Sequence, residues 1–124
     1  MRLQILVLVA LTACSSLDGV YTGECVIESS GKRTVYDVEV DITQSSKGGI
    51  DGDGEVISNL DSTISRGDVD GSRDGDDISF DIEFDKGEAL SGSMSFDGTV
   101  DGAEIDGGCE LNNLTGKFDL ERED

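Results

Sequence analysis

The stretch RTVYDVEVDITQ, residues 33–44, decides the fold, because from residue 36 onward it alternates apolar and polar side chains without interruption. Tyr36, Val38, Val40 and Ile42 occupy one parity, and acidic residues or threonine occupy the other. Successive side chains of a β-strand point to opposite faces, so a period of two places all the apolar residues on one face. The stretch therefore predicts a half-buried antiparallel strand with a charged outer face.

The same rhythm recurs on both sides of this stretch, and no segment has the period of a helix. The chain has 17 glycines and no proline, and clusters of small and polar residues separate the alternating segments, as is typical of strands joined by hairpins. Strands are predicted at residues 18–28, 33–44, 49–58, 62–72, 77–85, 89–96, 99–111 and 114–121. The Asp97-Gly98 pair predicts the hairpin turn after the sixth strand, and a change of parity predicts a bulge near Asp101-Gly102.

The short connections between these strands favour an all-β fold, an up-and-down antiparallel barrel of about eight strands. All the aromatic residues fall on the parity assigned to the inner face, namely Tyr21, Tyr36, Phe80, Phe84, Phe96 and Phe118. Cys25 and Cys109 also point inward, the first on the first strand and the second on the seventh strand or its link to the eighth. In a closed barrel the first and last strands pair, which would bring these cysteines together. A two-sheet β-sandwich is the alternative that the same pattern permits.

The N-terminus has a different composition from the rest of the chain. Arg2 is followed by a short apolar run that ends at Leu11. This run is roughly half of the about 20 apolar residues that a membrane-spanning helix requires. A positive start, a short apolar run and small residues after it predict a secretory signal peptide over residues 1–13.

The sequence LTAC at residues 11–14 resembles the lipobox of bacterial lipoproteins. The resemblance implies cleavage before Cys14, attachment of lipid to that cysteine, and a membrane anchor in the cell envelope. An ordinary signal peptide followed by a chance cysteine is the alternative. Ser15 after the cysteine implies the outer membrane, by the sorting pattern of many Gram-negative members. On this basis residues 14–17 are the lipidated cysteine and a short tether, and residues 18–124 are the barrel domain.

Removal of the signal peptide leaves two cysteines, Cys25 and Cys109. An even count in an oxidising compartment predicts a disulfide. Two separate buried thiols are the alternative. The chain-entropy relation assigns a bridge that closes so long a loop a stabilisation of about 4–5 kcal/mol.

The chain carries 28 acidic and 9 basic residues, which gives a formal net charge of −19. Such a surface repels the phosphates of nucleic acids, so we expect no nucleic-acid partner. It attracts cationic proteins or peptides over a range of about 8–10 Å at moderate salt. An acid-rich, lysine-poor surface is equally typical of proteins from saline habitats.

The sequence contains no histidine, which removes Ser-His-Asp and Cys-His catalysis and the usual histidine metal sites. Paired carboxylates are frequent, but on alternating strands they face water. Glycoside hydrolysis instead requires two carboxylates in different environments within a cleft. We therefore expect no enzymatic activity.

One acid-rich segment resembles part of an EF-hand calcium loop, because oxygen ligands occur at alternate positions and a glycine follows. Its candidate calcium ligands are Asp70, Ser72, Asp74, Asp76 and Asp81. The segment departs from the EF-hand pattern at Asp77, where an apolar residue is normal, and at Asp81, where glutamate is normal. Its flanks are strands instead of helices. Hydrated hairpin turns are the alternative interpretation, and no other cofactor is indicated.

The strand rhythm resembles the calycin group of small barrels, which includes lipocalins and avidins. The resemblance implies a barrel and transfers no binding residue, because the chain has no tryptophan. The first functional hypothesis is a membrane-anchored, non-enzymatic acidic barrel that binds a partner in the envelope. The second is a carrier of a small apolar ligand, for which the inner-face glycines Gly23, Gly92 and Gly116 would leave space. The same glycines are compatible with strands that coil around a filled core. A calcium-stabilised surface protein is the third hypothesis.

Overall fold

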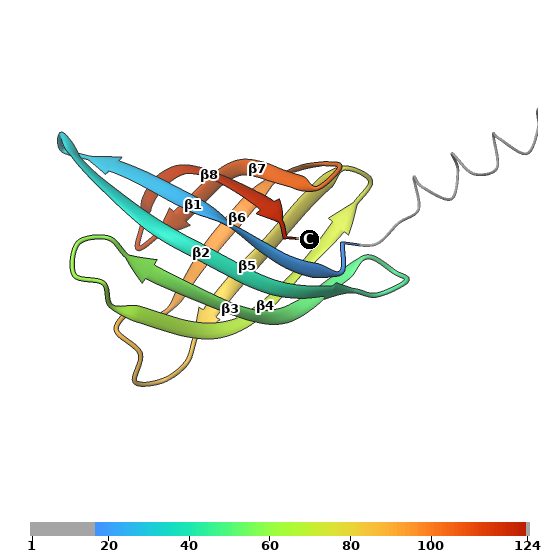
Figure 1. Ribbon diagram of the computed structural model, residues 1–124, viewed down its shortest axis with the longest axis horizontal. Helices are drawn as coiled ribbons and strands as arrows, with labels where there is room; N and C mark the ends of the chain where they lie inside the picture. The colour runs from blue at the N-terminus through green and yellow to red at the C-terminus, as the bar shows by residue number, and fades with distance from the viewer. Residues whose placement is uncertain (1–16, 124) are drawn as a thin grey trace, which may run out of the picture.

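The computed structural model describes residues 17–123, and within them the chain forms a closed barrel of eight strands (Figure 1). The strands are β1 (Gly19–Ser29), β2 (Lys32–Gln44), β3 (Gly49–Ser58), β4 (Ile64–Asp74), β5 (Asp77–Phe84), β6 (Ser93–Asp101), β7 (Glu104–Leu111) and β8 (Leu114–Arg122). Each strand pairs antiparallel with the next, and β8 pairs with β1 to close the barrel. The predicted up-and-down barrel is confirmed, and the sandwich alternative is wrong.

The N-terminal segment enters the barrel at Leu17. The predicted signal peptide, residues 1–13, and the predicted lipidation site Cys14 lie outside the described residues. Leu17, which was assigned to the tether, is 2 % exposed and belongs to the hydrophobic core. Its backbone N–H donates a hydrogen bond to Gln44 Oε1 at 3.2 Å. Among the described residues, no helix is long and apolar enough to cross a membrane.

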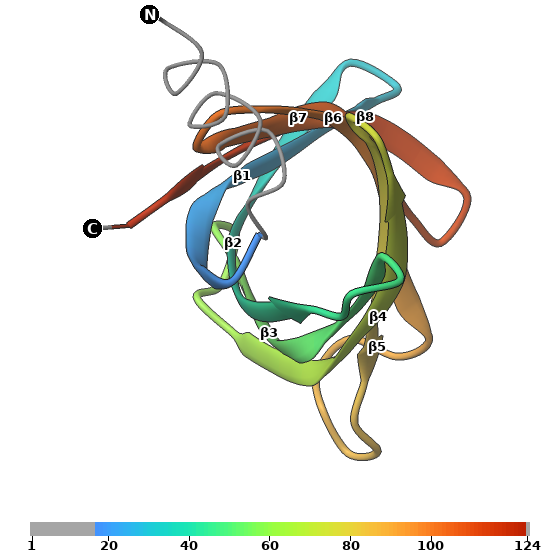
Figure 2. The same cartoon turned by 90° about the vertical axis from the view of Figure 1, so that its right-hand side faces the viewer.

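The two ends of the barrel carry different connections (Figures 1 and 2). The terminal end holds the first and last described residues and the connections at 45–48, 75–76 and 102–103. The far end holds the tight turns at 30–31 and 112–113 and the longer loops at 59–63 and 85–92. Connections alternate between the ends because each strand runs antiparallel to the one before it.

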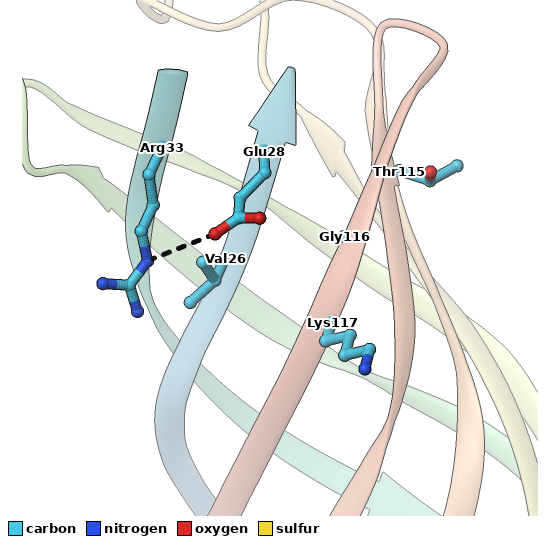
Figure 3. A pocket seen from close by; sticks show the side chains of 6 residues that line it. All are labelled: Val26, Glu28, Arg33, Thr115, Gly116 and Lys117. Atoms are coloured by element: carbon cyan, nitrogen blue, oxygen red, sulfur yellow. Dashed lines mark ion pairs between the residues drawn. The ribbon is translucent and has the colours of Figure 1, made fainter. Parts of the chain in front are cut away.

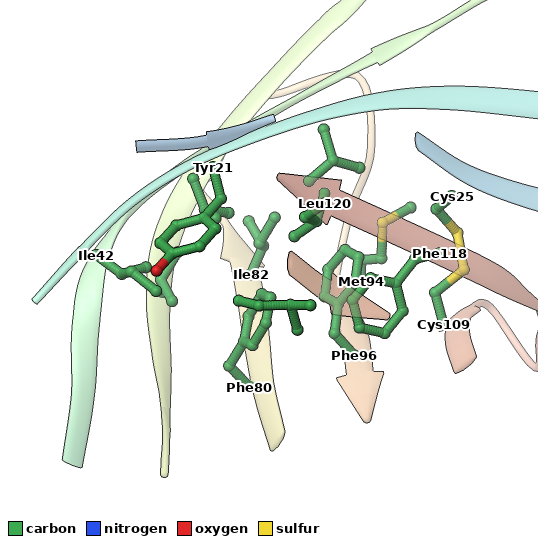
Figure 4. Close-up of a cluster of buried hydrophobic side chains, with 14 of the residues drawn as sticks. Tyr21, Cys25, Ile42, Phe80, Ile82, Met94, Phe96, Cys109, Phe118 and Leu120 are labelled. Carbon is green, nitrogen blue, oxygen red and sulfur yellow. A yellow bond between two sulfur atoms is a disulfide. The ribbon is translucent and has the colours of Figure 1, made fainter. Parts of the chain in front are cut away.

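The inward side chains form one apolar core (Figure 4). Along β5, exposed and buried residues alternate from Asp77 to Phe84 without exception. Phe80 and Phe96 lie opposite each other and stack with ring centroids 4.7 Å apart, and Phe118 meets Phe96 edge-on at 5.1 Å. Aromatic pairs of this geometry contribute about 0.5–1.5 kcal/mol beyond their buried area. The three rings therefore hold β5, β6 and β8 together from the inside.

Cys25 and Cys109 form the predicted disulfide, which joins β1 to β7 across β8. Cys25 lies opposite Phe118 of β8, and Cys109 lies opposite Gly116. The two Cα atoms are 6.3 Å apart, whereas residues two strands apart in a flat sheet are about 9.5 Å apart. The sheet is therefore sharply curved here. Gly116 permits that curvature, because a Cβ at this position would lie 2.1 Å from the Val26 carbonyl oxygen.

The hairpin turn predicted at Asp97-Gly98 is wrong. Both residues lie inside β6, and the chain turns at residues 102–103. Gly98 lies opposite Gly107, and a Cβ at Gly98 would lie 2.0 Å from the Asp106 carbonyl oxygen. This glycine therefore serves the close approach of two backbones in a coiled sheet and not a turn.

The segment before β6 also differs from the prediction. The sixth strand begins at Ser93 instead of Ala89, because residues 85–92 form a loop at the far end. Leu90 packs against the core from this loop, and its N–H donates to Ser65 Oγ at 2.9 Å. The loop thus helps to close the far end of the barrel.

Two further predictions, a bulge near Asp101-Gly102 and an inward position for Leu114, are wrong as well. The change of parity at Asp101-Gly102 is the β6–β7 hairpin and not a bulge, since Gly102 has a φ of 62° and turns the chain. Leu114, which was expected to point inward, is 44 % exposed because it begins β8 at the far rim.

Candidate functional site

Acidic side chains on the outer face line up across neighbouring strands. Asp41 of β2 lies directly opposite Asp53 of β3. Asp53 lies opposite Asp68 of β4, and Asp68 lies opposite Glu83 of β5. All four residues are exposed. They form the first acidic row.

Two further rows of directly opposed acids lie on the outer face of the barrel. The second acidic row consists of Asp37 on β2, Glu24 on β1, Asp119 on β8 and Asp106 on β7. The third acidic row consists of Asp51 on β3, Asp70 on β4 and Asp81 on β5. Together the three rows include every strand except β6, so carboxylates face carboxylates around most of the barrel.

Directly opposed like charges destabilise a sheet. Cβ atoms in such pairs are about 4.5–5.5 Å apart, and cross-strand pair energies are about 0.2–1 kcal/mol. The ion pairs Arg66–Glu55, at 3.1 Å, and Arg33–Glu28, at 4.0 Å, include no member of the rows. Within residues 17–123 no row member forms an ion pair, so side-chain cations do not offset the repulsion.

An open groove follows part of the second row across β1, β8 and β7. Its volume is about 400 Å³, and it is lined by Thr22, Gly23, Glu24, Glu104, Asp119 and Glu121. Glu121 lies directly opposite both Thr22 and Glu104. Four carboxylates therefore converge on this hollow. It is a part of the outer wall that is suited to hold a cationic group.

The inner glycines do not open a space for a ligand. A Cβ at Gly23 would lie 1.8 Å from the Asp119 carbonyl oxygen, and Gly116 is equally crowded. Gly92, which was expected on the inner face, is exposed in the 85–92 loop. These positions hold strand backbones close together or turn the chain, so they give the carrier hypothesis no support.

The structure does not gather the predicted calcium ligands into one site. Asp70, Ser72 and Asp74 follow one another on the outer face of β4, and Asp76 lies in the next turn. Asp81 lies on β5 directly opposite Asp70, and both belong to the third acidic row. Across the part of the chain that the structure describes, no group of three or more Asp, Glu, Cys or His side chains is placed to hold a metal ion.

One buried polar atom lies in the core near the terminal end. Tyr21 is fully buried, and among residues 17–123 its hydroxyl makes no hydrogen bond of good geometry, although the guanidinium of Arg122 acts on it. Burial raises the pKa of Tyr21 above its ordinary value of 10.0, and the positive charge of Arg122 partly opposes that rise. Arg122 lies directly opposite Tyr21 on β8. The ring therefore contributes to the core, while the hydroxyl is a weak point at alkaline pH.

The sequence predicted outward acids but missed the rows, because alternation gives the face of a residue and not its opposite neighbour. Register follows from the length of each hairpin. The two-residue turn at 30–31 pairs Ser29 with Lys32 and, by counting back along both strands, Glu24 with Asp37. The Ser-Gly turn was therefore the available signal for this pair.

No family model, no curated protein and no solved structure matches this chain. A functional assignment must therefore come from the register of the strands and the surface that they create.

Proposed function

We propose that this protein is a lipid-anchored, non-enzymatic binding module of a bacterial cell envelope, and that its acidic outer wall holds a cationic protein or peptide. The observation that carries the proposal is the direct opposition of carboxylates in the acidic rows. A cationic group beside a row neutralises two or more neighbouring charges at once. Binding thus relieves a repulsion that the free protein carries.

The form of the rows suits an elongated partner. Neighbouring strands are about 4.8 Å apart, so a row of four carboxylates extends over roughly 14 Å. The groove along the second row adds a hollow where a lysine or arginine side chain can lie among carboxylates. A segment with several basic residues fits this surface better than a single small cation does.

The proposal is for a non-enzymatic protein, and the chemistry of the outer wall supports it. The chain has no histidine, and the row carboxylates share one exposed environment on the outer wall. General acid–base pairs need two groups whose environments separate their pKa values. Binding is therefore the chemistry that this wall supports.

The position of Leu17 supports anchoring at the terminal end. Leu17 is buried three residues after Cys14, and three extended residues span no more than about 11 Å. A lipid on Cys14 would hold the terminal end next to the membrane and leave the far end exposed. More than one acyl chain would make such an anchor stable, because each buried CH₂ contributes about 0.8 kcal/mol.

A titration with a lysine- and arginine-rich peptide tests the binding surface. Asp41→Asn, Asp53→Asn and Asp68→Asn together should weaken binding, and the affinity of the parent should fall as salt rises. The matched control replaces three acids that have no acid directly opposite, Asp85→Asn, Asp97→Asn and Glu110→Gln. Equal loss in both triple variants would show that only net charge matters. Binding that ignores salt would contradict the proposal.

Mass spectrometry of the protein from bacterial membranes tests the anchor. The expected mature chain begins at Cys14 and is heavier by its acyl chains. Cys14→Ser should leave the protein unlipidated and release it from the membrane fraction. An unmodified Cys14, or a mature N-terminus at another residue, would contradict the anchor without affecting the binding proposal.

A further inference from the structure

The charged residues at inward positions of the strands are all basic. Every aspartate and glutamate of the eight strands alternates with the inward residues and so lies at an outward position. Arg73 of β4 shares the parity of the buried Val69, and Arg122 of β8 shares the parity of the buried Leu120. Both arginines lie at the terminal end, whereas Lys32, the other inward cation, lies at the far tip of the β1–β2 hairpin. The barrel therefore combines an acidic outer wall with two cations turned toward its terminal mouth.

Arg122 extends at this mouth without an ion pair. It lies directly opposite Tyr21 of β1. Gly19 makes room for its side chain, because a Cβ at Gly19 would lie 3.0 Å from Arg122 Cδ. The residue is exposed, and within residues 17–123 it forms no ion pair. A guanidinium group binds carboxylate or phosphate through two parallel hydrogen bonds in one plane. Arg122 therefore presents that geometry to an anion from outside the barrel.

Gln44 and Arg73 are held beside each other at the same mouth. Arg73 Nη1 donates a hydrogen bond to Gln44 Oε1 at 3.3 Å, and the backbone N–H of Leu17 donates to the same oxygen at 3.2 Å. Arg73 Nε also donates to the Gly75 carbonyl oxygen at 2.7 Å. Both lone pairs of Gln44 Oε1 are thus engaged, and the amide NH₂ group of Gln44 is left as a donor.

The buried hydroxyl of Tyr21 lies near both arginines. Burial raises the pKa of Tyr21, and the charges of Arg122 and Arg73 oppose that rise. Asp18 is the acid that also acts on this hydroxyl, and its Oδ1 accepts a hydrogen bond from the Gln44 backbone N–H at 2.8 Å. Because the hydroxyl is buried, the guanidinium of Arg122 is the group that an anion meets first. The mouth cluster, which consists of Arg73, Arg122, Gln44 and Tyr21, thus gathers two positive charges and several donors.

We infer that the mouth cluster binds the phosphodiester of a zwitterionic phospholipid headgroup and seats the terminal end of the barrel on the membrane. The inference rests on the proposed lipid anchor, which holds this end beside the headgroups. The net charge of −19 repels polyanions and anionic lipids. A headgroup with an ammonium beside its phosphate avoids this repulsion, because carboxylates flank the cluster at Asp18, Glu121 and Glu123.

The short tether makes even a weak site effective. Five residues separate Gly19 from Cys14, so the two lie within about 18 Å of each other. A short tether turns binding into an intramolecular event with an effective concentration on the order of 1 mM. A dissociation constant of about 1 mM for a single headgroup is therefore sufficient to occupy the site at the membrane.

A groove at the far end provides a matched comparison (Figure 3). Its volume is about 630 Å³, and residues of β1, β2 and β8 line it. Arg33 in this groove forms an ion pair with Glu28 at 4.0 Å, so its charge already has a partner. Lys117, from β8, is a point charge without the planar geometry of a guanidinium. The groove therefore supplies an exposed arginine that is not expected to bind the headgroup.

An NMR titration of the disulfide-bonded full chain with three soluble probes tests the inference. The probes are glycerophosphoethanolamine, glycerophosphoglycerol and inorganic phosphate, and the first should bind most tightly. Arg122→Gln should raise its dissociation constant about tenfold. Arg122→Lys keeps the charge without the planar fork and should recover only part of the affinity. Arg33→Gln removes the same charge at the far end and should leave the constant unchanged. Thermal unfolding checks that the variants fold, as the exposure of both arginines leads us to expect.

The outcomes separate the mouth cluster from the anchor. Absence of binding for all three probes would overturn the inference even if Cys14 carries lipid. Equal losses in Arg122→Gln and Arg33→Gln, or a loss in Arg33→Gln alone, would overturn the assignment to the mouth cluster. Tighter binding of inorganic phosphate, or equal binding of the two headgroups, would overturn the zwitterionic lipid. The titration requires no acyl chain, so headgroup binding with an unmodified Cys14 would contradict the anchor and leave the site in place.

Discussion

The two faces of the barrel wall are built from the same strands and have opposite energetics. Inward residues form one apolar core with stacked rings and a disulfide. Outward residues set carboxylates directly against carboxylates in the acidic rows. The inward residues therefore stabilise the fold, while the outward carboxylates repel one another. The protein tolerates the acidity of its surface because the core and the disulfide more than offset the repulsion.

Loss of the disulfide should weaken the inner face most. Replacement of Cys25 and Cys109 together by alanine removes a crosslink with a sequence separation of 84. We expect the free energy of unfolding to fall by about 4–5 kcal/mol, measured by equilibrium denaturation in urea. A reductant should bring the parent to the same stability and leave the double variant unchanged. A loss below about 1 kcal/mol would mean that packing alone holds β1 to β7.

A cavity in the core should have the next largest effect. Phe96→Ala removes the ring that stacks on Phe80 and meets Phe118 edge-on, and it should cost about 3–5 kcal/mol. Ser95→Ala, one residue away on the outer face, should change the free energy of unfolding by no more than about 0.5 kcal/mol. Similar losses in the two variants would contradict the assignment of stability to the inward parity.

Relief of repulsion on the outer face should stabilise the protein. Asp53 has an acid directly opposite on both sides, so Asp53→Asn should raise the free energy of unfolding by about 0.2–1 kcal/mol. Glu110→Gln removes the same charge, but Glu110 faces Ser95 and Thr115. The difference between the variants isolates direct opposition. It should shrink at about 1 M salt, where the screening length is about 3 Å, and a difference of zero at low salt would show that opposition is harmless.

The smallest effect at neutral pH should come from Tyr21→Phe, because the lost hydroxyl makes no hydrogen bond of good geometry among residues 17–123. The substitution should change the free energy of unfolding mainly at alkaline pH. The folded pKa of Tyr21 is raised, so as the pH rises the unfolded chain loses the phenolic proton first. The stabilisation by the neutral tyrosine is complete below pH 10.0 and is lost as the pH climbs through the raised folded pKa.

Thermal unfolding at several alkaline pH values measures this effect. Tyr21→Phe should lose less stability than the parent as the pH rises above about 10. Tyr36→Phe keeps Tyr21 and should retain the parent's alkaline loss. Identical pH profiles for the parent and Tyr21→Phe would show that the buried hydroxyl does not control the alkaline limit.

Much of the inner face could be predicted from the sequence, because alternation is a local property. The alternation from residue 36 to residue 42 shows by itself which side chains are buried. The same alternation predicted that Cys25 and Cys109 point inward, where they form their disulfide. The structural role of each glycine was harder to predict. Asp97-Gly98 has the local chemistry of a hairpin turn, and only the approach of β7 to β6 shows that Gly98 serves a close contact.

The outer face depends on register, which is not local, and so less of it could be predicted. The acidic rows require the turn between each pair of strands to be placed correctly, and the error at Asp97-Gly98 shifts the pairing beyond it. The outward aliphatic residues did leave a local signal. Val26-Ile27, Val35-Tyr36 and Val56-Ile57 are consecutive apolar pairs, and an alternating strand can bury only one member of each.

The disulfide across β8 also determines how the barrel responds to mechanical force. A pull through the N-terminal segment reaches Leu17 first and then peels β1 away from β2 and β8. Peeling must stop at Cys25, because that residue is covalently bound to β7. Only residues before Cys25 can be drawn out while the rest of the barrel stays closed. The bridge thus acts as a stop that limits extension under load.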